Sequence, residues 1–334
     1  MRRTKRSRFE PGGAPGLRLT ERDVEIVKAV ARYRVLHSEM IGRAVALAGF
    51  ETGGIDTCRE AFDPAKKIRD RLTELFHGGF LDRPRSGFSF ALPGSDPIAY
   101  AVGREGERLL ARLDVEMDAS PGRKTRNATS GFLEHQLLIN EVAISLRESV
   151  SSNMSVAIGD EMRAAAAARR SHPFRFSAEV TLGTETRTIG TEPDLAFTIG
   201  ADDRTLAFFV EVDRSTEPAL RYRYARGARR PTLTGTSILR KLLAYGALKR
   251  TDTIKDRLGW RNFKVLFVCE TLPGSGNRIA RLMEVVRDHV PKQTAMFLFA
   301  SADDITQSDN ILQVPWRDAD GNITRLDPER IRSA

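Results

Sequence analysis

Apolar residues recur every three or four positions in three stretches near the start of the chain, and this spacing predicts three amphipathic helices. The first helix begins after Thr20, an N-cap candidate with Asp23 at the third helical position. The second begins near Ser38, and the third begins at residues 63–64, an Asp-Pro pair that is favoured at helix starts. The apolar positions of the three helices are, in order, Val24, Val27, Val30 and Ala31; Ile41, Ala44, Val45 and Ala48; and Ile68, Leu72, Leu75 and Phe76.

Two short segments after the third helix have the pattern of strands. Residues 78–79, both glycine, end the helix, and residues 80–81 begin a strand. A Ser-Gly pair at 86–87 provides a turn, and apolar residues alternate along 98–102 as a return strand. Three helices followed by a two-stranded wing predict an α+β winged helix-turn-helix domain over residues 17–117.

The next segment, residues 118–131, has almost no large apolar residues, which predicts a linker. Beyond it, helical and strand-like apolar segments alternate, as in an α/β sheet covered on both faces. We therefore expect an α/β domain over residues 132–334. Its elements are expected in the order helix, three strands, helix, strand, helix and strand, at residues 132–147, 154–158, 194–199, 206–213, 237–249, 263–269, 277–290 and 295–299.

The composition is that of a globular protein, with 41% hydrophobic and 29% charged residues in a chain of 334. Its two cysteines, Cys58 and Cys269, exclude a disulfide framework and a zinc site built from cysteine. No run of about 18 apolar residues predicts a membrane span, and the N-terminus lacks the apolar core of a secretory signal. We therefore expect a cytoplasmic protein without a membrane partner.

The net charge is +9 and the calculated pI is about 9.8, which indicates an anionic partner. Residues 1–8 carry five positive charges and no negative charge, so residues 1–16 are expected to form a basic flexible arm. No amphipathic stripe accompanies this charge, which favours nucleic acid over a membrane as the partner. The alternative is that these charged residues are only solvated and bind no partner.

The third predicted helix carries basic residues beside its apolar stripe, where a recognition helix contacts the major groove of DNA. These residues are Lys66, Lys67, Arg69 and Arg71. Two alternatives stay open: the basic residues form an ordinary solvated face, or the winged helix mediates protein contacts.

Three carboxylates are expected to meet at the end of the strand over 206–213. The two-residue period of a strand places Glu211 and Asp213 on the same face, and a turn at 200–204 folds the preceding strand back so that Asp194 lies beside Glu211. Three carboxylate oxygen donors suit Mg²⁺ or Mn²⁺. The alternative is that Asp194 caps a turn and the other two carboxylates pair with nearby arginines.

These residues carry a resemblance to a known family. The Pro-Asp pair ending at Asp194, followed by Glu211-Val212-Asp213 within the order helix, three strands, helix, strand, resembles the PD-(D/E)XK nuclease fold. With a winged helix in front, residues 17–270 resemble the replication-relaxation family, which includes the MOB-C class of plasmid relaxases. The resemblance implies sequence-directed DNA binding by the first domain and metal-dependent cleavage of one strand by the second, in plasmid mobilisation or replication.

Carried onto this chain, the resemblance makes Asp194, Glu211 and Asp213 the metal-binding candidates and adds His135 and Glu141 on the helix over 132–147. A lone helical histidine is more often structural. The nuclease motif usually has lysine where this chain has Asp213. Lys241, on the helix that follows, is the candidate to supply that charge, and Tyr245 shares its helix face. The alternative is that Lys241 is an ordinary solvated lysine.

An arginine- and tyrosine-rich segment lies between the Glu211 strand and the Lys241 helix. Phosphate pairing by arginine combined with base stacking on tyrosine is typical of a groove for single-stranded DNA. The DNA-binding candidates in it are Arg221, Tyr222, Arg223, Tyr224 and Arg226. A loop ordered by acidic neighbours is the alternative.

Other chemistries have less support in the sequence. The five histidines include no close pair, which argues against a histidine-cluster relaxase, and no phosphate-binding GxxxxGK[ST] motif occurs. The hypothesis is therefore a protein of a plasmid or mobile element that binds double- and single-stranded DNA, with other mobilisation or replication proteins as further partners, and nicks one strand with a divalent metal. The alternative is a non-catalytic DNA-binding regulator or replication accessory protein that retains a nuclease-like scaffold.

Overall fold

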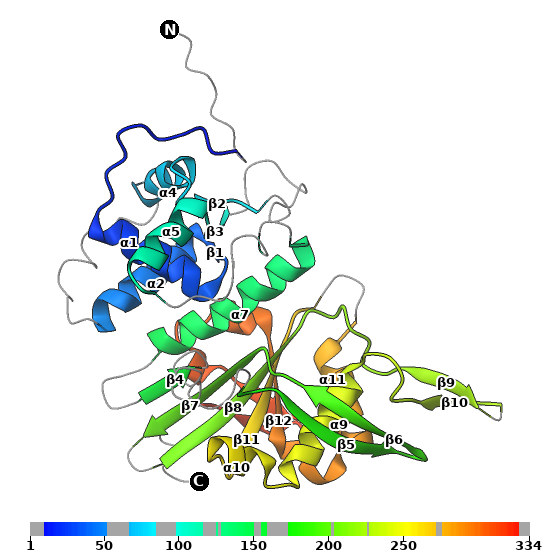
Figure 1. Cartoon of the computed structure of the whole chain (residues 1–334). Coiled ribbons are helices and arrows are strands. Elements are labelled where there is room, and N and C mark those ends of the chain that lie inside the picture. Colours follow the sequence, from blue (N-terminus) through cyan, green and yellow to red (C-terminus); the bar gives the residue numbers. More distant parts are fainter. Residues whose placement is uncertain are drawn as a thin grey trace. The chain divides into compact units, whose positions relative to one another are not determined.

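The structure is a computed structural model in which the chain divides into two compact units, Met1–Ile144 and Ser145–Ala334 (Figure 1). The residues that it describes are 10–51, 67–84, 98–115, 125, 128–149, 155–158, 173–201, 204–225, 227–271 and 276–326. Most of the expected linker and the first nine residues of the expected basic arm lie outside this set.

The described residues of the first unit up to 115 form four helices, of which the last was not predicted. They are α1 (Glu21–Tyr33), α2 (Ser38–Glu51), α4 (Lys67–His77) and α5 (Arg104–Arg112). Thr20 caps α1 in a reciprocal capping box with Asp23, as predicted. On α1, Val27 and Val30 of the apolar series are buried, whereas Val24 and Ala31 are half-buried. Ile26 completes the buried stripe together with other α1 residues.

Helix α4 buries the four residues that its periodicity indicated, which are Ile68, Leu72, Leu75 and Phe76. The helix start expected at residues 63–64 lies outside the described residues. The helix ends at Gly79, whose φ of 76° is a left-handed conformation that glycine adopts without strain.

A small antiparallel sheet accompanies these helices. Its strands are β1 (Leu36–His37), β2 (Leu81–Asp82) and β3 (Ala99–Val102), and in the described residues they pair in the order β1-β3-β2. The two strands of the expected wing are therefore present. Strand β1 was not expected, because two residues are too few to show an alternating pattern.

The second unit is built on a mixed sheet, which confirms the α/β class. Its strands are β4 (Ser155–Ile158), β7 (Leu195–Ala201), β8 (Arg204–Asp213), β11 (Phe263–Cys269), β12 (Phe297–Ser301), β13 (Trp316–Asp318) and β14 (Ile323–Thr324). In the described residues these seven strands lie in the order β14-β13-β12-β11-β8-β7-β4. Strands β8, β11 and β12 are parallel, and every other neighbouring pair is antiparallel.

Helices α9 (Ile238–Lys249) and α11 (Arg278–His289) pack on one face of this sheet. Phe209 of β8 stacks on Tyr245 of α9, with ring centroids 5.8 Å apart. Shorter helical segments are α10 (Thr253–Leu258), η2 (Pro291–Met296), α12 (Ala302–Thr306) and η3 (Ile311–Gln313). The last predicted strand starts two residues later than expected, because η2 occupies the residues before Phe297.

Two hairpins lie outside the main sheet. One is formed by β5 (Phe176–Leu182) and β6 (Glu185–Thr191), which pack on α9, and the other by β9 (Tyr222–Ala225) and β10 (Ala228–Pro231). The first hairpin was not predicted, and the second replaces the arginine-rich loop that the sequence suggested. Helix α7 (Ser130–Glu148) runs across the boundary between the two units. In the described residues no helix has the length and apolar character needed to cross a membrane.

Candidate functional site

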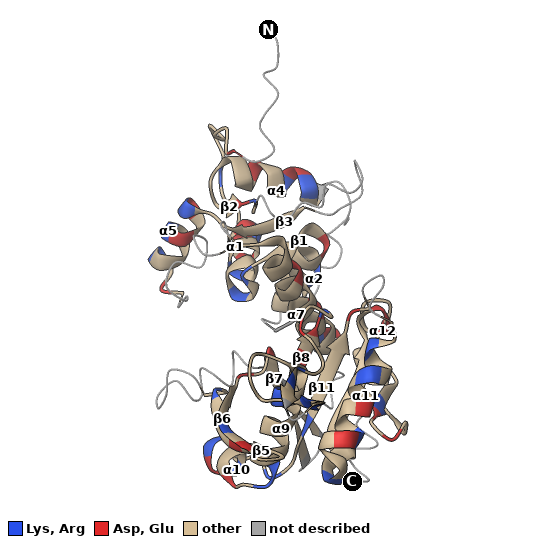
Figure 2. Cartoon of the chain, turned by 90° about the vertical axis from the view of Figure 1, so that its right-hand side faces the viewer, with Lys and Arg blue, Asp and Glu red and all other residues tan. Residues whose placement is uncertain are grey.

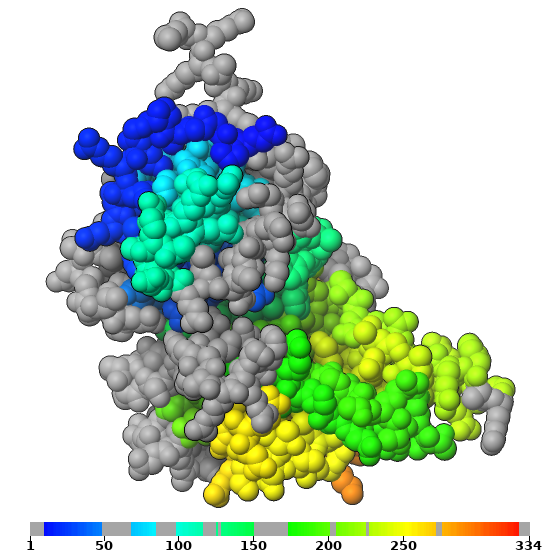
Figure 3. All heavy atoms as spheres, viewed as in Figure 1, coloured from blue at the N-terminus to red at the C-terminus, as the bar shows by residue number. Residues whose placement is uncertain are grey.

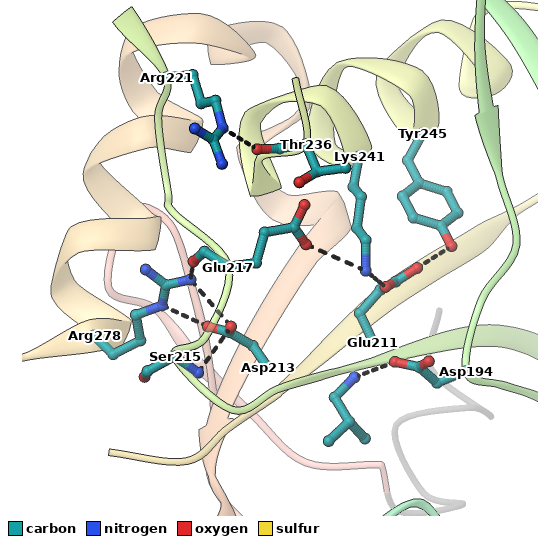
Figure 4. A network of polar contacts seen from close by, with 11 residues as sticks. Asp194, Glu211, Asp213, Ser215, Glu217, Arg221, Thr236, Lys241, Tyr245 and Arg278 are labelled. Atoms are coloured by element: carbon teal, nitrogen blue, oxygen red, sulfur yellow. Dashed lines mark hydrogen bonds and ion pairs between the residues drawn. The ribbon is translucent and has the colours of Figure 1, made fainter. Parts of the chain in front are cut away.

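Two carboxylates meet at the carboxyl end of β8, near the centre of the sheet (Figure 4). The antiparallel pairing of β7 with β8, predicted as a hairpin, is confirmed, and Leu195 lies opposite Val210. Asp194 precedes this pair, and its backbone N–H donates to the carbonyl of Val210 at 3.0 Å. Its Oδ2 accepts from the backbone N–H of Val212 at 2.8 Å. The side chain of Asp194 is thereby held beside Glu211.

Glu211 points from β8 toward α9 and is 1% exposed. Its Oε2 lies 2.6 Å from the Nζ of Lys241, and its Oε1 accepts from the hydroxyl of Tyr245 at 2.6 Å. Lys241 and Tyr245 are four residues apart on α9, so they share the helix face that covers Glu211. The side chain of Lys241 is 33% exposed, so part of it contacts solvent.

The ionisation of this cluster follows from its burial. Burial raises the pKa of the Glu211 carboxyl to about 7; the charge of Lys241 opposes this rise, and the charge of Asp194 adds to it. Burial alone would lower the pKa of Lys241, but the charges of Glu211 and Asp194 outweigh it, and the pKa is raised. Burial and the charge of Glu211 raise the pKa of Tyr245 well above its ordinary value. Lys241 therefore stays charged, Tyr245 stays a donor, and Glu211 exchanges a proton near neutral pH.

Asp213 has different partners from the other two predicted ligands. It is 4% exposed, and its two oxygens lie 2.6 Å and 3.0 Å from the guanidinium nitrogens of Arg278 on α11. Such a bidentate pair occupies one lone pair on each oxygen and neutralises the charge of the carboxylate. The structure thus brings Asp194 and Glu211 together and directs Asp213 to Arg278 instead. Within the described residues, no three His, Cys, Asp or Glu side chains form a group suited to hold a metal ion.

Glu217 is a neighbour of the site that the sequence did not indicate. Its Oε2 lies 3.9 Å from the Nζ of Lys241, and its backbone carbonyl accepts from Arg278 at 2.6 Å (Figure 4). It follows β8 in an irregular segment, where no periodicity places a side chain. The sequence offered one indication of its role, which is that a carboxylate follows Asp213 by four residues.

Asp194 and Glu211 are the two carboxylates that would hold a divalent cation; both oxygens of Glu211 accept from Lys241 and Tyr245 in this structure, and both oxygens of Asp213 accept from Arg278. Mg²⁺ is usually held by one or two carboxylates together with the phosphates of a substrate, so a two-carboxylate site meets its needs. Burial is the main cause of the raised pKa of Glu211, and the charge of Asp194 adds to it; a bound cation would favour the ionised form of Glu211.

The family comparison covers these residues. A family model described as replication-relaxation matches residues 28–260, well over half of the chain. The chain belongs to the replication-relaxation family. No curated protein and no solved structure matches it. This match confirms the expected membership in the replication-relaxation family and indicates a role in the replication or mobilisation of a plasmid or mobile element.

The matched region spans α9 and β8, and so includes Asp194, Glu211 and Lys241. It ends before β11, so Arg278, the partner of Asp213, lies outside it. The family match therefore extends to the Glu211 cluster and not to the contact that removes Asp213 from this cluster.

The candidates on α7 lie in the first unit of this replication-relaxation protein. Glu141 pairs with Arg43 of α2 at 2.6 Å, and Asn140 donates to the carbonyls of Tyr33 and Val35. These contacts hold α7 against the rest of its unit. His135 is half-buried on the same helix.

The basic candidates on α4 have separate roles. Arg69 is exposed, and Figure 2 shows that α4 carries both basic and acidic side chains. Arg71 instead binds the fully buried carboxylate of Asp23 at 2.5 Å and 2.8 Å, and also pairs with Glu74. It joins α4 to the start of α1. Lys67 begins α4, and Lys66 lies outside the described residues.

The arginine–tyrosine segment forms the β9–β10 hairpin. Arg221, just before it, donates to the carbonyl of Thr236 at 2.8 Å. Tyr222, Arg223 and Tyr224 lie on β9, and Arg226 lies outside the described residues.

Proposed function

We propose that this replication-relaxation protein is a metal-dependent DNA-nicking enzyme that acts on a plasmid or mobile element. The observation that carries the proposal is the Lys241 ammonium group, 2.6 Å from the Glu211 carboxylate at the end of β8 and beside Asp194. A pair of carboxylates next to a permanently charged lysine is suited to the hydrolysis of a phosphodiester, in which negative charge develops on the phosphate oxygens.

Each residue has a distinct task in this proposal. Asp194 and Glu211 would hold Mg²⁺ or Mn²⁺, which supplies a hydroxide nucleophile and neutralises phosphate charge when it is bound. Lys241 stabilises the charge that develops on the cleaved phosphodiester; its raised pKa makes it a fixed cation rather than a proton donor. Tyr245 donates to Glu211 and fixes the orientation of that carboxylate. This division supports a PD-(D/E)XK-like site in which Lys241 supplies the charge that the motif usually places at the position of Asp213.

The first unit would deliver the DNA. Helices α1, α2 and α4 and the small sheet support a winged helix-turn-helix in which α4 lies in the major groove. Arg69 and Lys67 are the side chains proposed to contact duplex DNA, whereas Arg71 is occupied by Asp23. We further propose that the protein belongs to the MOB-C class of relaxases and that its partners include other mobilisation or replication proteins.

The test is a nicking assay on a supercoiled plasmid that carries the origin or transfer region of the protein's own mobile element, with Mg²⁺ or Mn²⁺. We expect relaxed circles with the wild type and none with Glu211→Gln or Lys241→Met, while both variants still shift the DNA in a gel. Lys249→Met is the matched control, because Lys249 lies on the same helix but binds Asn262 instead of the cluster. Full nicking by Glu211→Gln or Lys241→Met would refute the assigned site.

A second function is favoured by one observation. Both oxygens of Glu211 already have hydrogen-bond partners within the unit, as in an ion pair that serves only the fold. A wild type that binds the plasmid and never relaxes it would identify a non-catalytic DNA-binding or replication accessory protein on a nuclease-like scaffold.

A further inference from the structure

The β9–β10 hairpin presents two chemically different faces. In its register, Arg223 lies directly opposite Arg230, and Tyr224 lies directly opposite Arg229. Because side chains alternate between the faces of a strand, Arg223 and Arg230 share one face. Tyr222, Tyr224 and Arg229 share the other.

In the part of the chain that the structure describes, no acidic side chain pairs with Arg223 or Arg230 on the first of these faces. Like charges directly opposite each other on paired strands destabilise the pair. Both arginines are exposed, and neither side chain forms an ion pair or hydrogen bond with any residue that the structure describes. An anion bound between the two guanidinium groups would remove this repulsion, so the hairpin is built to hold one.

The other face offers an aromatic ring to solvent. Tyr224 is 82% exposed. Tyr222 is held more firmly, since the guanidinium group of Arg229 lies 3.9 Å from its ring centroid and its hydroxyl accepts from Arg281 at 3.3 Å. An exposed tyrosine beside a fixed cation–aromatic pair is suited to stack on a base that is not already stacked in a duplex.

The base of the hairpin is firmly held. Arg221 binds the carbonyl of Thr236, just before α9. The carboxylate of Glu185 accepts from Thr232 Oγ1 at 2.9 Å and from the N–H of Leu233 at 3.0 Å. Burial opposes ionisation of Glu185, but the hydrogen bond from Arg187 and those from Leu233 and Thr232 outweigh it and lower the pKa to about 2. The hairpin thus projects from its unit on a fixed base, as the yellow-green segment at the right of Figure 3 shows.

The hairpin also has a defined place in the chain relative to the candidate site. It leaves from the end of β8, which carries Glu211, and returns to the start of α9, which carries Lys241. A strand bound to the hairpin is therefore held by the same two elements that form the site.

We infer that the β9–β10 hairpin binds single-stranded DNA, with Arg223 and Arg230 on the phosphate backbone and Tyr224 stacked on a base. The inference rests on the proposed function only in taking DNA as the ligand. Arg221, which was a candidate from the sequence, holds the base of the hairpin instead, and Arg230 takes its place among the residues proposed to contact the strand.

The experiment measures binding of the full chain to a fluorescent single-stranded oligonucleotide and to a duplex of equal length, by anisotropy in EDTA over a salt series. In Arg230→Glu, a glutamate faces Arg223, which removes the repulsion within the hairpin and repels phosphate. We expect this variant to lose at least tenfold in single-strand affinity, with no decrease in thermal stability. The slope of log affinity against log salt concentration should be smaller by roughly 0.7 for each phosphate that the variant no longer binds. Arg317→Glu, at an exposed arginine on β13, is the matched control and should leave the unit's thermal stability and single-strand binding much closer to wild type.

Tyr224 is tested in the same assay. Tyr224→Ala should weaken single-strand binding roughly fivefold or more with little change in the salt slope, because stacking releases few ions, and Tyr224→Phe should restore binding. Duplex binding, assigned to the first unit, should not change.

Three results would overturn the inference: unchanged single-strand affinity in Arg230→Glu, equal losses on single strand and duplex in Tyr224→Ala, or competition by polyglutamate as strong as that by unlabelled single strand. The last result would identify an acidic protein as the partner. EDTA prevents nicking, so the binding assay does not depend on the nicking assay, and failure of the nicking assay leaves this inference intact. If instead the wild type nicks normally but Arg230→Glu keeps the single-strand affinity of the wild type, this inference alone is overturned.

Discussion

Replacing Arg278 by methionine should destabilise the second unit, because the change leaves the carboxylate of Asp213 buried without its cation. Asp213 is 4% exposed and Arg278 is 8% exposed, and the pair is bidentate at 2.6 Å and 3.0 Å. Removing one partner of a buried ion pair costs about 3–5 kcal/mol. The carbonyl of Glu217 also loses a hydrogen bond, so the cost is expected in the upper part of this range.

The paired substitution separates the ion pair from general packing. In Asp213→Leu with Arg278→Met, no charge remains buried, and apolar replacement of a whole ion pair is often nearly neutral. The double variant should therefore recover most of the stability that Arg278→Met loses. The two residues are 65 positions apart in sequence but in direct contact, so the double-mutant cycle should show a coupling of roughly 2 kcal/mol or more.

Urea unfolding followed by tryptophan fluorescence is the assay. The chain's two tryptophans, Trp260 and Trp316, both lie in the second unit, so the signal reports on that unit alone. A loss below about 1 kcal/mol in Arg278→Met, or no recovery in the double variant, would refute the reasoning.

The same variants test the assignment of the metal site. Mn²⁺ binding, measured by titration calorimetry, should be equal in the wild type and in the Asp213→Leu/Arg278→Met protein, because Asp213 is placed outside the site. Loss of Mn²⁺ binding in the double variant would instead make Asp213 a ligand.

Two further predictions concern charged residues in the two units. The pKa of Glu211 rises from 4.5 to about 7 on folding, so this carboxyl stabilises the fold fully below pH 4.5 and loses this contribution as the pH rises through 7. Glu211→Gln should therefore flatten the pH dependence of the unfolding free energy between pH 4.5 and 7. If urea unfolding gives the same pH dependence for the wild type and the variant, this prediction is contradicted. In the first unit, Arg71→Ala should cost about 3 kcal/mol in thermal unfolding because it leaves Asp23 buried without its cation, whereas Arg69→Ala should keep the stability and weaken duplex binding. A stable Arg71→Ala protein with weakened duplex binding would reverse these assignments.

Much of the fold was predictable from local patterns. The capping box of Thr20, the buried stripe of α4 and the bounds of β11 follow from residues that are close together in sequence. The β5–β6 hairpin was missed although β5 alternates apolar and polar residues, as a half-buried strand does; β6 has Ile189 as its one large apolar residue and shows no such pattern. The β9–β10 hairpin was taken as a loop, since arginine-rich segments do not show the apolar alternation of a strand.

The sequence by itself determined which carboxylates lie at the end of β8, because a strand's two-residue period and a tight turn place Asp194 and Glu211 from local geometry alone. Only the tertiary structure decided the partner of each charge. Asp213 was expected with Glu211 and binds Arg278, and Arg71 was expected on DNA and binds Asp23. The physical reason is that a buried charge takes the counter-ion that packing brings within about 3 Å, and packing joins elements that no local pattern relates. Lys241 shows the same dependence: its helix was predictable, but its contact with Glu211 exists only because α9 packs across the end of β8.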